Sequence, residues 1–161
     1  MQQPSLELLP DDLRKRFLAP SKSVTFYCHL FVGVVVFGGL GVYFAIWHSH
    51  WSMSDTSAAL LCYFPALAAA AMLEFDIQDQ PYLRSFGIIA LVIFVVLFLF
   101  GSQCGSGWQF FWSVIGTILS ILFWWVANGL NDRFNDVKPQ SALGGDPAAQ
   151  LAQSPEGGWL K

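Results

Sequence analysis

The sequence predicts an all-α membrane protein, with four transmembrane helices packed as a small bundle and both termini in the cytoplasm. Hydrophobic residues make up 55% of the 161 positions and charged residues only 12%, whereas about a quarter of the residues in soluble domains are charged. The hydrophobic residues also gather in long blocks, and the first block, 24–47, contains no Asp, Glu, Lys or Arg. Such blocks are typical of helices that cross a bilayer.

Four apolar segments are long enough to be transmembrane helices, since a helix rises about 1.5 Å per residue and a hydrocarbon core is about 30 Å thick. Within a transmembrane domain over 24–130, the predicted spans cover residues 24–47, 56–73, 83–100 and 108–130. The second span is rich in Ala and has Pro65 near its middle. Neighbouring helices can satisfy the carbonyl group that a proline frees, so we expect a kink there and not a break.

Residues 1–23 are predicted to form a cytoplasmic segment that contains a short amphipathic helix. Acidic residues in its first turn and basic residues in its last turn complement the helix dipole. Leu13 and Phe17 share one face, which lets the helix lie in the headgroup layer. The residues expected to contact lipid or a partner are Arg14, Lys15 and Arg16. A solvated flank, whose basic residues only fix the topology, is an equally good interpretation.

Residues 131–161 are predicted to be a flexible cytoplasmic tail. A stretch rich in Pro, Gly, Ala and Gln buries too little apolar surface to offset the entropy lost on ordering it. Trp159 is the exception, because a large aromatic side chain near a mobile end is a candidate anchor for a partner protein. An uncommitted terminus is the simpler interpretation.

The distribution of basic residues predicts the orientation, because Lys and Arg accumulate in short cytoplasmic segments. All eight basic residues fall on one side of a four-span threading: four precede the first span, one lies where the second connection meets the third span, and three follow the last. The connections 48–55 and 101–107 contain none and are the predicted exterior loops. We therefore expect an integral protein of a bacterial inner membrane or an organelle membrane.

Small residues three or four positions apart predict the faces on which the spans pack, because helices in lipid associate by close van der Waals approach. The predicted helix-packing residues are Gly38, Gly41 and Ala45 in the first span, Ala66 and Ala70 in the second, and Gly116 and Ser120 in the fourth. We therefore expect the first, second and fourth spans to form the core, and the more uniformly bulky third span to face lipid or a partner. Ordinary membrane-helix composition is the alternative explanation.

No residue pattern indicates a catalytic, cofactor-binding or metal site. His29 is the lone imidazole at depth within a span, whereas a haem bound by two imidazoles needs a second. His48, His50 and Asp55 in the first exterior connection match no zinc spacing of predictable geometry. The three cysteines form no Cys-x-x-Cys pair, and the net charge of -3 argues against nucleic-acid binding.

The function favoured by the sequence is that of a non-catalytic accessory, anchoring or assembly subunit of a larger membrane complex. Its expected partners are the lipid bilayer and other membrane subunits or copies of itself. The main alternative is a homo-oligomeric pore-forming or membrane-sensing protein, in which Thr117, Ser120 and Asn128 supply a sparse polar lining. An intramembrane enzyme is the third and weakest hypothesis, because no Asp, Glu or Lys lies at mid-depth.

Overall fold

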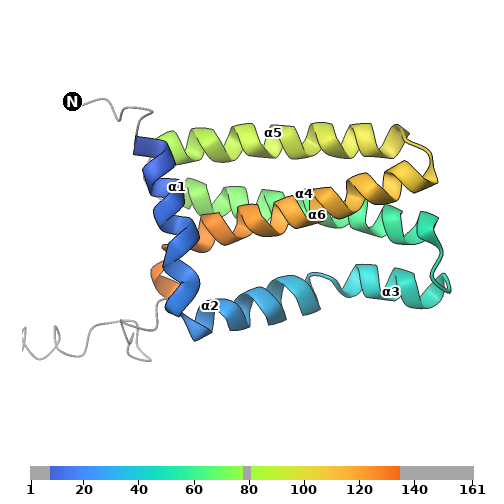
Figure 1. Ribbon diagram of the computed structural model, residues 1–161, viewed down its shortest axis with the longest axis horizontal. Helices are drawn as coiled ribbons and strands as arrows, with labels where there is room; N and C mark the ends of the chain where they lie inside the picture. The colour runs from blue at the N-terminus through green and yellow to red at the C-terminus, as the bar shows by residue number, and fades with distance from the viewer. Residues whose placement is uncertain (1–7, 78–80, 135–161) are drawn as a thin grey trace, which may run out of the picture.

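Every regular element is a helix in the computed structural model, which describes residues 8–77 and 81–134 (Figure 1). Four helices are long and apolar enough to cross a membrane: Val24–His48, Met53–Ile77, Pro81–Gln103 and Gly107–Asn128. This confirms the predicted all-helical class and the four candidate spans. The chain thus has the architecture of a multi-pass integral membrane protein.

The described elements in chain order are α1 (Leu8–Leu18), the 3-10 turn η1 (Ala19–Lys22), α2 (Val24–Cys28), the π-helix η2 (His29–Phe37), α3 (Leu40–His48), α4 (Met53–Ile77), α5 (Pro81–Gln103), α6 (Ser106–Asn128) and the 3-10 turn η3 (Asp132–Phe134). The second and third spans extend past their predicted bounds at both ends, because helical hydrogen bonding continues into the flanking polar residues. Pro65 lies inside α4 without ending it.

The hydrophobic core lies among α4, α5 and α6. Its buried members are Leu61, Phe64, Ala68, Ala71 and Phe75 of α4, Leu83 and Phe94 of α5, and Phe123 and Ala127 of α6. The rings interlock, with the Phe123 centroid 5.4 Å from that of Phe75 and 5.7 Å from that of Phe94. Aromatic packing of this kind contributes beyond the area it buries.

The expectation that the third span stays outside the core was therefore wrong. A Cβ atom at Gly87 of α5 would lie 3.3 Å from the Cβ of Phe75, so the missing side chain lets α5 approach α4 closely. The other end of α5 comes close in the same way at Gly101, which faces Leu61. Two glycines far apart on an otherwise bulky helix thus let α5 pack closely against α4.

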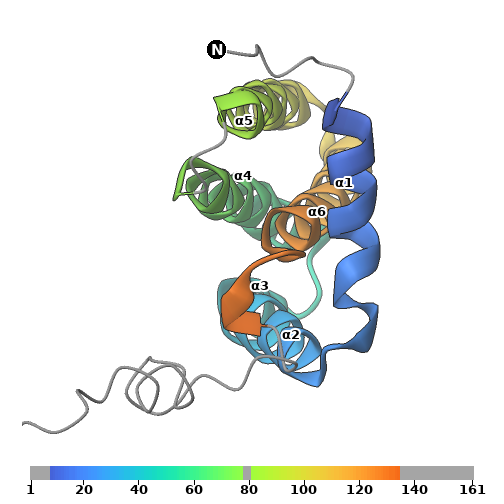
Figure 2. The ribbon, with the colours of Figure 1, turned by 90° about the vertical axis from the view of Figure 1, so that its left-hand side faces the viewer.

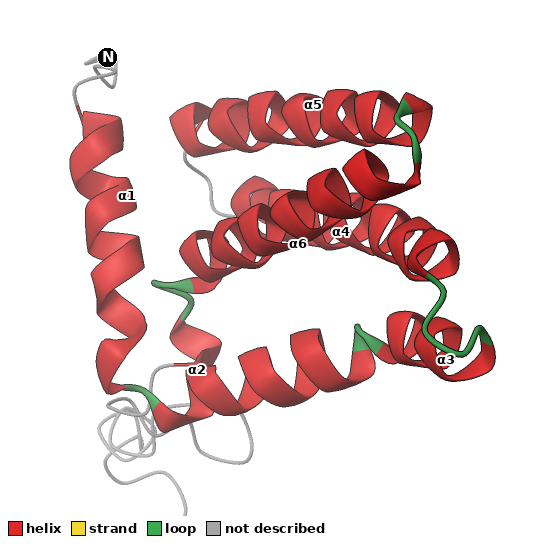
Figure 3. Ribbon diagram, turned by 45° about the vertical axis from the view of Figure 1, so that its right-hand side comes forward, coloured by secondary structure: helices red, strands yellow, loops and turns green. Residues whose placement is uncertain are grey.

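The first span consists of α2, η2 and α3 and lies to one side of the other three helices (Figure 3). At one end α3 packs on α4. At the other end Phe26 is buried against two rings of α6, with centroids 5.7 Å from Trp124 and 5.0 Å from Trp125. The expectation that the first span belongs to the tight core was also wrong, because the buried core cluster is formed by α4, α5 and α6.

Helix α1 lies across one end of the bundle, at a steep angle to the long helices (Figure 2). Leu9 and Leu13 pack against the core, and the Trp125 indole Nε1 donates to the Phe17 carbonyl at 3.0 Å. We call this the α1 end, and the opposite end, which carries the connections after α3 and α5, the loop end. The short helix predicted within residues 1–23 is thus present, as Leu8–Leu18.

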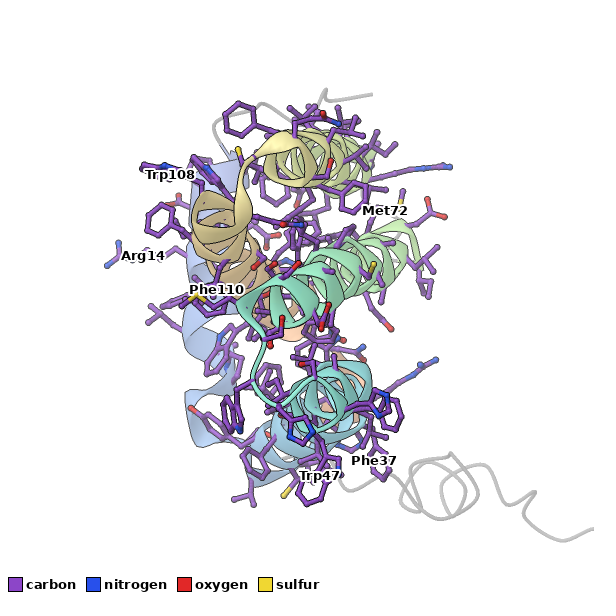
Figure 4. All side chains as sticks on the ribbon, turned by 90° about the vertical axis from the view of Figure 1, so that its right-hand side faces the viewer. Arg14, Phe37, Trp47, Met72, Trp108 and Phe110 are labelled. Atoms are coloured by element: carbon purple, nitrogen blue, oxygen red, sulfur yellow. The ribbon has the colours of Figure 1, made fainter. Side chains whose placement is uncertain are left out.

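The outer surfaces of the spans are apolar. On α5 the exposed side chains include Ile88, Ile89, Val92, Ile93, Val96, Leu99 and Phe100. Figure 4 shows Phe37 and Trp47 on the outer side of the first span, and Arg14 pointing away from the bundle on α1. Such a surface suits contact with a lipid bilayer.

Candidate functional site

The first span is interrupted near its middle, at Gly38 and Gly39. The amide of Gly38 donates to the carbonyl of Gly33, five residues back, at 2.9 Å, whereas the Gly39 amide donates to Val35, four residues back, at 3.1 Å. Because of this change of spacing, neither glycine amide donates to the carbonyl of Val34. An unpaired carbonyl costs several kcal/mol inside a bilayer, so the break requires a donor from elsewhere.

Two tyrosine hydroxyls supply donors at the break. Tyr63 of α4 donates to the Val34 carbonyl at 2.7 Å, and Tyr43 of α3 donates to the Val35 carbonyl at 3.0 Å. The Tyr63 bond joins two spans, so it also holds the break against α4. π-Helical turns and discontinuous membrane helices often occur at functional sites, which makes this region the candidate site.

Glycine is required on both sides of the break because of close approach. A Cβ atom at position 38 would collide with the Val34 carbonyl and lie 3.2 Å from the Tyr63 ring. At position 39 it would collide with the Val35 carbonyl and lie 3.0 Å from the Tyr43 ring. Both glycines have helical φ angles, -63° and -78°, so space and not handedness imposes the choice.

A crevice of about 420 Å³ lies between the first span and α4, on the α1 side of the break. One wall consists of His29, Gly33, Val34 and Gly38, the other of Tyr63, Ala66, Leu67 and Ala70, and Trp124 of α6 closes the back. Small residues on both walls create the space. The Tyr63–Val34 hydrogen bond lies at the inner limit of this crevice.

Polar and aromatic groups surround the crevice at the α1 end. The ring of His29 lies 4.8 Å from that of Phe134, and its Nδ1 is 2.9 Å from the Thr25 carbonyl. The Ser23 hydroxyl donates to the Phe134 carbonyl, which fixes η3 beside the start of the first span. Arg133, the residue before Phe134, is exposed. A cationic residue is therefore next in sequence to the ring that contacts His29 at this mouth.

A carboxylate also lies near the mouth. Glu74 follows Ala70 by one helical turn on α4, so the two residues share a face. The Asn131 Nδ2 donates to the Glu74 carboxylate at 3.2 Å, which ties the segment after α6 to the end of α4. The mouth therefore carries charges of both signs.

Polar side chains in the α4–α6 interface bond to their own helices. Ser57, Ser113 and Ser120 are completely buried, and each hydroxyl donates to the carbonyl three residues back at 2.8 Å. Asn128 is also buried, and its Nδ2 donates to the Trp124 carbonyl at 3.1 Å. These groups stabilise close packing and do not line an open path.

The predicted helix-packing residues occupy different environments. Gly116 is buried, and a Cβ atom there would come within 2.8 Å of the Phe64 ring. Ser120 is buried, Gly38 faces Tyr63, and Ala45 is half-buried. The exposed ones are Gly38, Gly41, Ala66 and Ala70. Ala66 and Ala70 line the crevice, and nothing lies within 4 Å of a Cβ atom at Gly41.

The basic residues of α1 also occupy different environments. Arg14 and Lys15 are exposed, as a contact with lipid or a partner requires. Arg16, expected to make the same contact, is instead only 3% exposed. Its Nε pairs with Asp12 at 2.8 Å, and its guanidinium lies 5.9 Å from the Phe75 ring centroid, because α1 turns this face onto the bundle. Trp159 lies outside the described residues.

Sequence reasoning missed the residues that make the crevice a site: Gly33, Tyr63, Trp124 and Phe134. Two signals were present in the sequence. Gly38 and Gly39 are adjacent in the middle of an apolar block, where a helix loses most by containing glycine. Tyr63 places a hydroxyl inside the second span, and a buried hydroxyl needs a hydrogen-bond partner.

Within 8–77 and 81–134, no group of three or more His, Cys, Asp or Glu side chains is placed to hold a metal ion. The site therefore offers shape, one imidazole and the charges at its mouth. Comparison with known protein families, curated proteins and solved structures finds no match to this chain.

Proposed function

We propose that the protein is a non-catalytic accessory, anchoring or assembly subunit of a larger membrane complex. Its α1 end faces the cytoplasm, as the one-sided distribution of basic residues favours, in a bacterial inner membrane or an organelle membrane. The observation that carries the proposal is that the polar side chains buried between α4 and α6 are committed to packing, whereas the exterior is apolar and free for contact.

The interior supports a scaffold role because its hydroxyls already have partners. Ser57, Ser113 and Ser120 bond to their own helices, and these bonds leave the α4–α6 interface closely packed. A subunit that only positions its neighbours needs such a rigid interior and no reactive group at depth.

The exterior supports contact with other membrane proteins. The exposed face of α5 is apolar over most of its length, and Gly41 on α3 leaves open space in which another helix can approach closely. Arg14 and Lys15 extend from α1 beside the headgroup layer, where they suit anionic lipid or an acidic partner.

A membrane-sensing homo-oligomer is the second candidate, and the break in the first span favours it. A discontinuous helix held by one tyrosine hydroxyl has a defined point at which to bend. The pore-forming version is weaker, because Ser120 and Asn128 face the inside of a single bundle and are removed from any lining between chains. An intramembrane enzyme ranks below both.

The test is purification of the full chain from its native membrane in mild detergent. Under the proposal it co-purifies with other subunits in a fixed ratio. A lone chain, or a symmetric homo-oligomer that changes state with bilayer composition, overturns the accessory role.

Gly41→Leu sharpens this test, because the single chain has room for the new side chain. The substitution should release the partners while the bundle stays folded, as judged by circular dichroism. The matched control is Gly33→Leu, which also enters open space but lies in the crevice. Retention of the partners by Gly41→Leu would contradict a contact at α3.

A further inference from the structure

The crevice fits within one leaflet. Its wall on α4 runs from Tyr63 to Ala70, and seven residues at about 1.5 Å each cover roughly 10 Å. Half of a hydrocarbon core about 30 Å thick is roughly 15 Å. The inner end is closed where Tyr63 bonds to Val34 and α3 returns to α4. Its occupant thus enters from one side of the membrane and stops near the midplane.

The depth of the crevice distinguishes between possible occupants. A partner helix would continue through both leaflets, whereas the crevice ends at the break. A single alkyl chain is narrow enough to enter and needs only one leaflet of depth.

The walls match an alkyl chain chemically. Gly33, Ala66 and Ala70 offer only hydrogen or methyl groups, and the Tyr63 hydroxyl is committed to the Val34 carbonyl. An empty apolar crevice loses the dispersion contacts of its lining, so occupation by a chain is favourable. No hydrogen-bonding demand arises along its described length.

The mouth matches a phosphate headgroup. Arg133 is exposed next to Phe134, whose ring contacts His29 at the start of the crevice. The Arg133 guanidinium can donate to phosphate oxygens, and the His29 ring, whose Nδ1 lies 2.9 Å from the Thr25 carbonyl, borders the same mouth. Glu74 is the acidic group facing the same region, and its carboxylate accepts a hydrogen bond from Asn131.

We infer that the crevice is a binding site for one phospholipid of the leaflet at the α1 end. One acyl chain lies between η2 and α4 up to the Tyr63–Val34 bond, and the phosphate lies beside Arg133 and His29. The remainder of the lipid stays in the bilayer. The inference needs only a membrane-spanning bundle, and it is independent of the proposed role as an accessory subunit.

The experiment is native mass spectrometry of the full chain in mild detergent with added phosphatidylglycerol. The wild-type chain should retain one lipid under collision conditions that remove the others. Gly33→Leu fills the crevice from a position where nothing lies within 4 Å, and it should lower the retained fraction about tenfold. Arg133→Gln should lower it about fivefold through the lost phosphate contact.

The matched control is Ile89→Phe, which adds bulk on the exposed face of α5 and should retain lipid like the wild type. If Gly33→Leu fails to fold, Ala70→Leu fills the crevice from the opposite wall. Equal retention by the wild type and a folded crevice variant would overturn the site and indicate surface lipid only. Because the measurement uses the isolated chain, its failure is distinguishable from loss of partners in Gly41→Leu.

Discussion

The Tyr63 hydroxyl joins the broken first span to α4 near the middle of the membrane. Its hydrogen bond to Val34 spans 29 positions of sequence. The bond has two consequences, since it satisfies a carbonyl in lipid and fixes the distance between two helices. Substitutions at this residue can therefore be tested for both stability and geometry.

Tyr63→Phe should lower the melting temperature in detergent and widen the separation between the first span and α4. The expected loss is about 1–3 kcal/mol, because the substitution leaves the Val34 carbonyl without its donor. The separation can be measured as a distance distribution between spin labels on α2 and α4.

Tyr43→Phe is the matched control, because its hydroxyl donates within the first span to Val35. It should lower stability without changing the distance between the spans. An unchanged distance in Tyr63→Phe would refute the role of Tyr63 as the link.

At single residues, the sequence predicts where close approach occurs better than it predicts what approaches. Gly116 was expected to pack, and its neighbour is the ring of Phe64. Gly41 followed the same spacing rule but faces open space in the single chain. The spacing of small residues marks both internal faces and faces that meet other molecules, so spacing alone cannot separate them.

At the scale of elements, the contact between α4 and α6 depends on the missing side chain of Gly116. Gly116→Ala places a methyl group within 2.8 Å of the fully buried Phe64 ring. Overpacking of this kind costs roughly 1–3 kcal/mol, which exceeds the gain of about 1 kcal/mol in helix propensity. Thermal unfolding in detergent should show a net loss.

Gly41→Ala is the control for this prediction, because the same methyl group enters open space on α3. Stability should be unchanged or slightly raised, as the helix propensity of alanine requires. A loss in both variants would show that glycine flexibility, and not packing against Phe64, accounts for the result.

The packing of α1 against the bundle depends on Gly129, just after α6. A Cβ atom there would collide with the Arg16 carbonyl, although the φ angle of -61° accepts alanine. Gly129→Ala should therefore detach α1 while the spans stay folded. Hydrogen exchange of the amides in Leu8–Leu18 should rise at least about tenfold, corresponding to roughly 1.4 kcal/mol of lost protection.

Gly105→Ala, in open space before α6, should leave that exchange unchanged. Equal protection of α1 in Gly129→Ala would show that Leu9, Leu13 and Trp125 hold the helix without a close fit at Gly129.

For the whole molecule, the proposed topology places the α1 end in the cytoplasm. In a chain with Cys28, Cys62 and Cys104 replaced by Ala, Gly105→Cys at the loop end should react with a membrane-impermeant thiol reagent added outside intact cells. Arg133→Cys at the α1 end should react only after permeabilisation. Both positions are exposed, so accessibility across the membrane decides the result. The reverse pattern would invert the topology.

The overall architecture was predictable because length and hydrophobicity alone define the four spans. Their pairing was not, since it depends on the fit between particular surfaces. Phe75, Phe94 and Phe123 interlock across three helices, and no periodicity in the sequence specifies which rings meet. The crevice was unpredictable for the same reason, as its walls come from residues 29–38 and 63–70 on separate helices.

The break in the first span gives the molecule two short helical rods where the other spans have one. Each rod can tilt by its own angle, so this part of the protein can match its apolar length to thick and thin bilayers with little strain. The three continuous spans lack that joint and must tilt as whole units. A change in lipid thickness is therefore expected to act mainly on the Gly38–Gly39 junction.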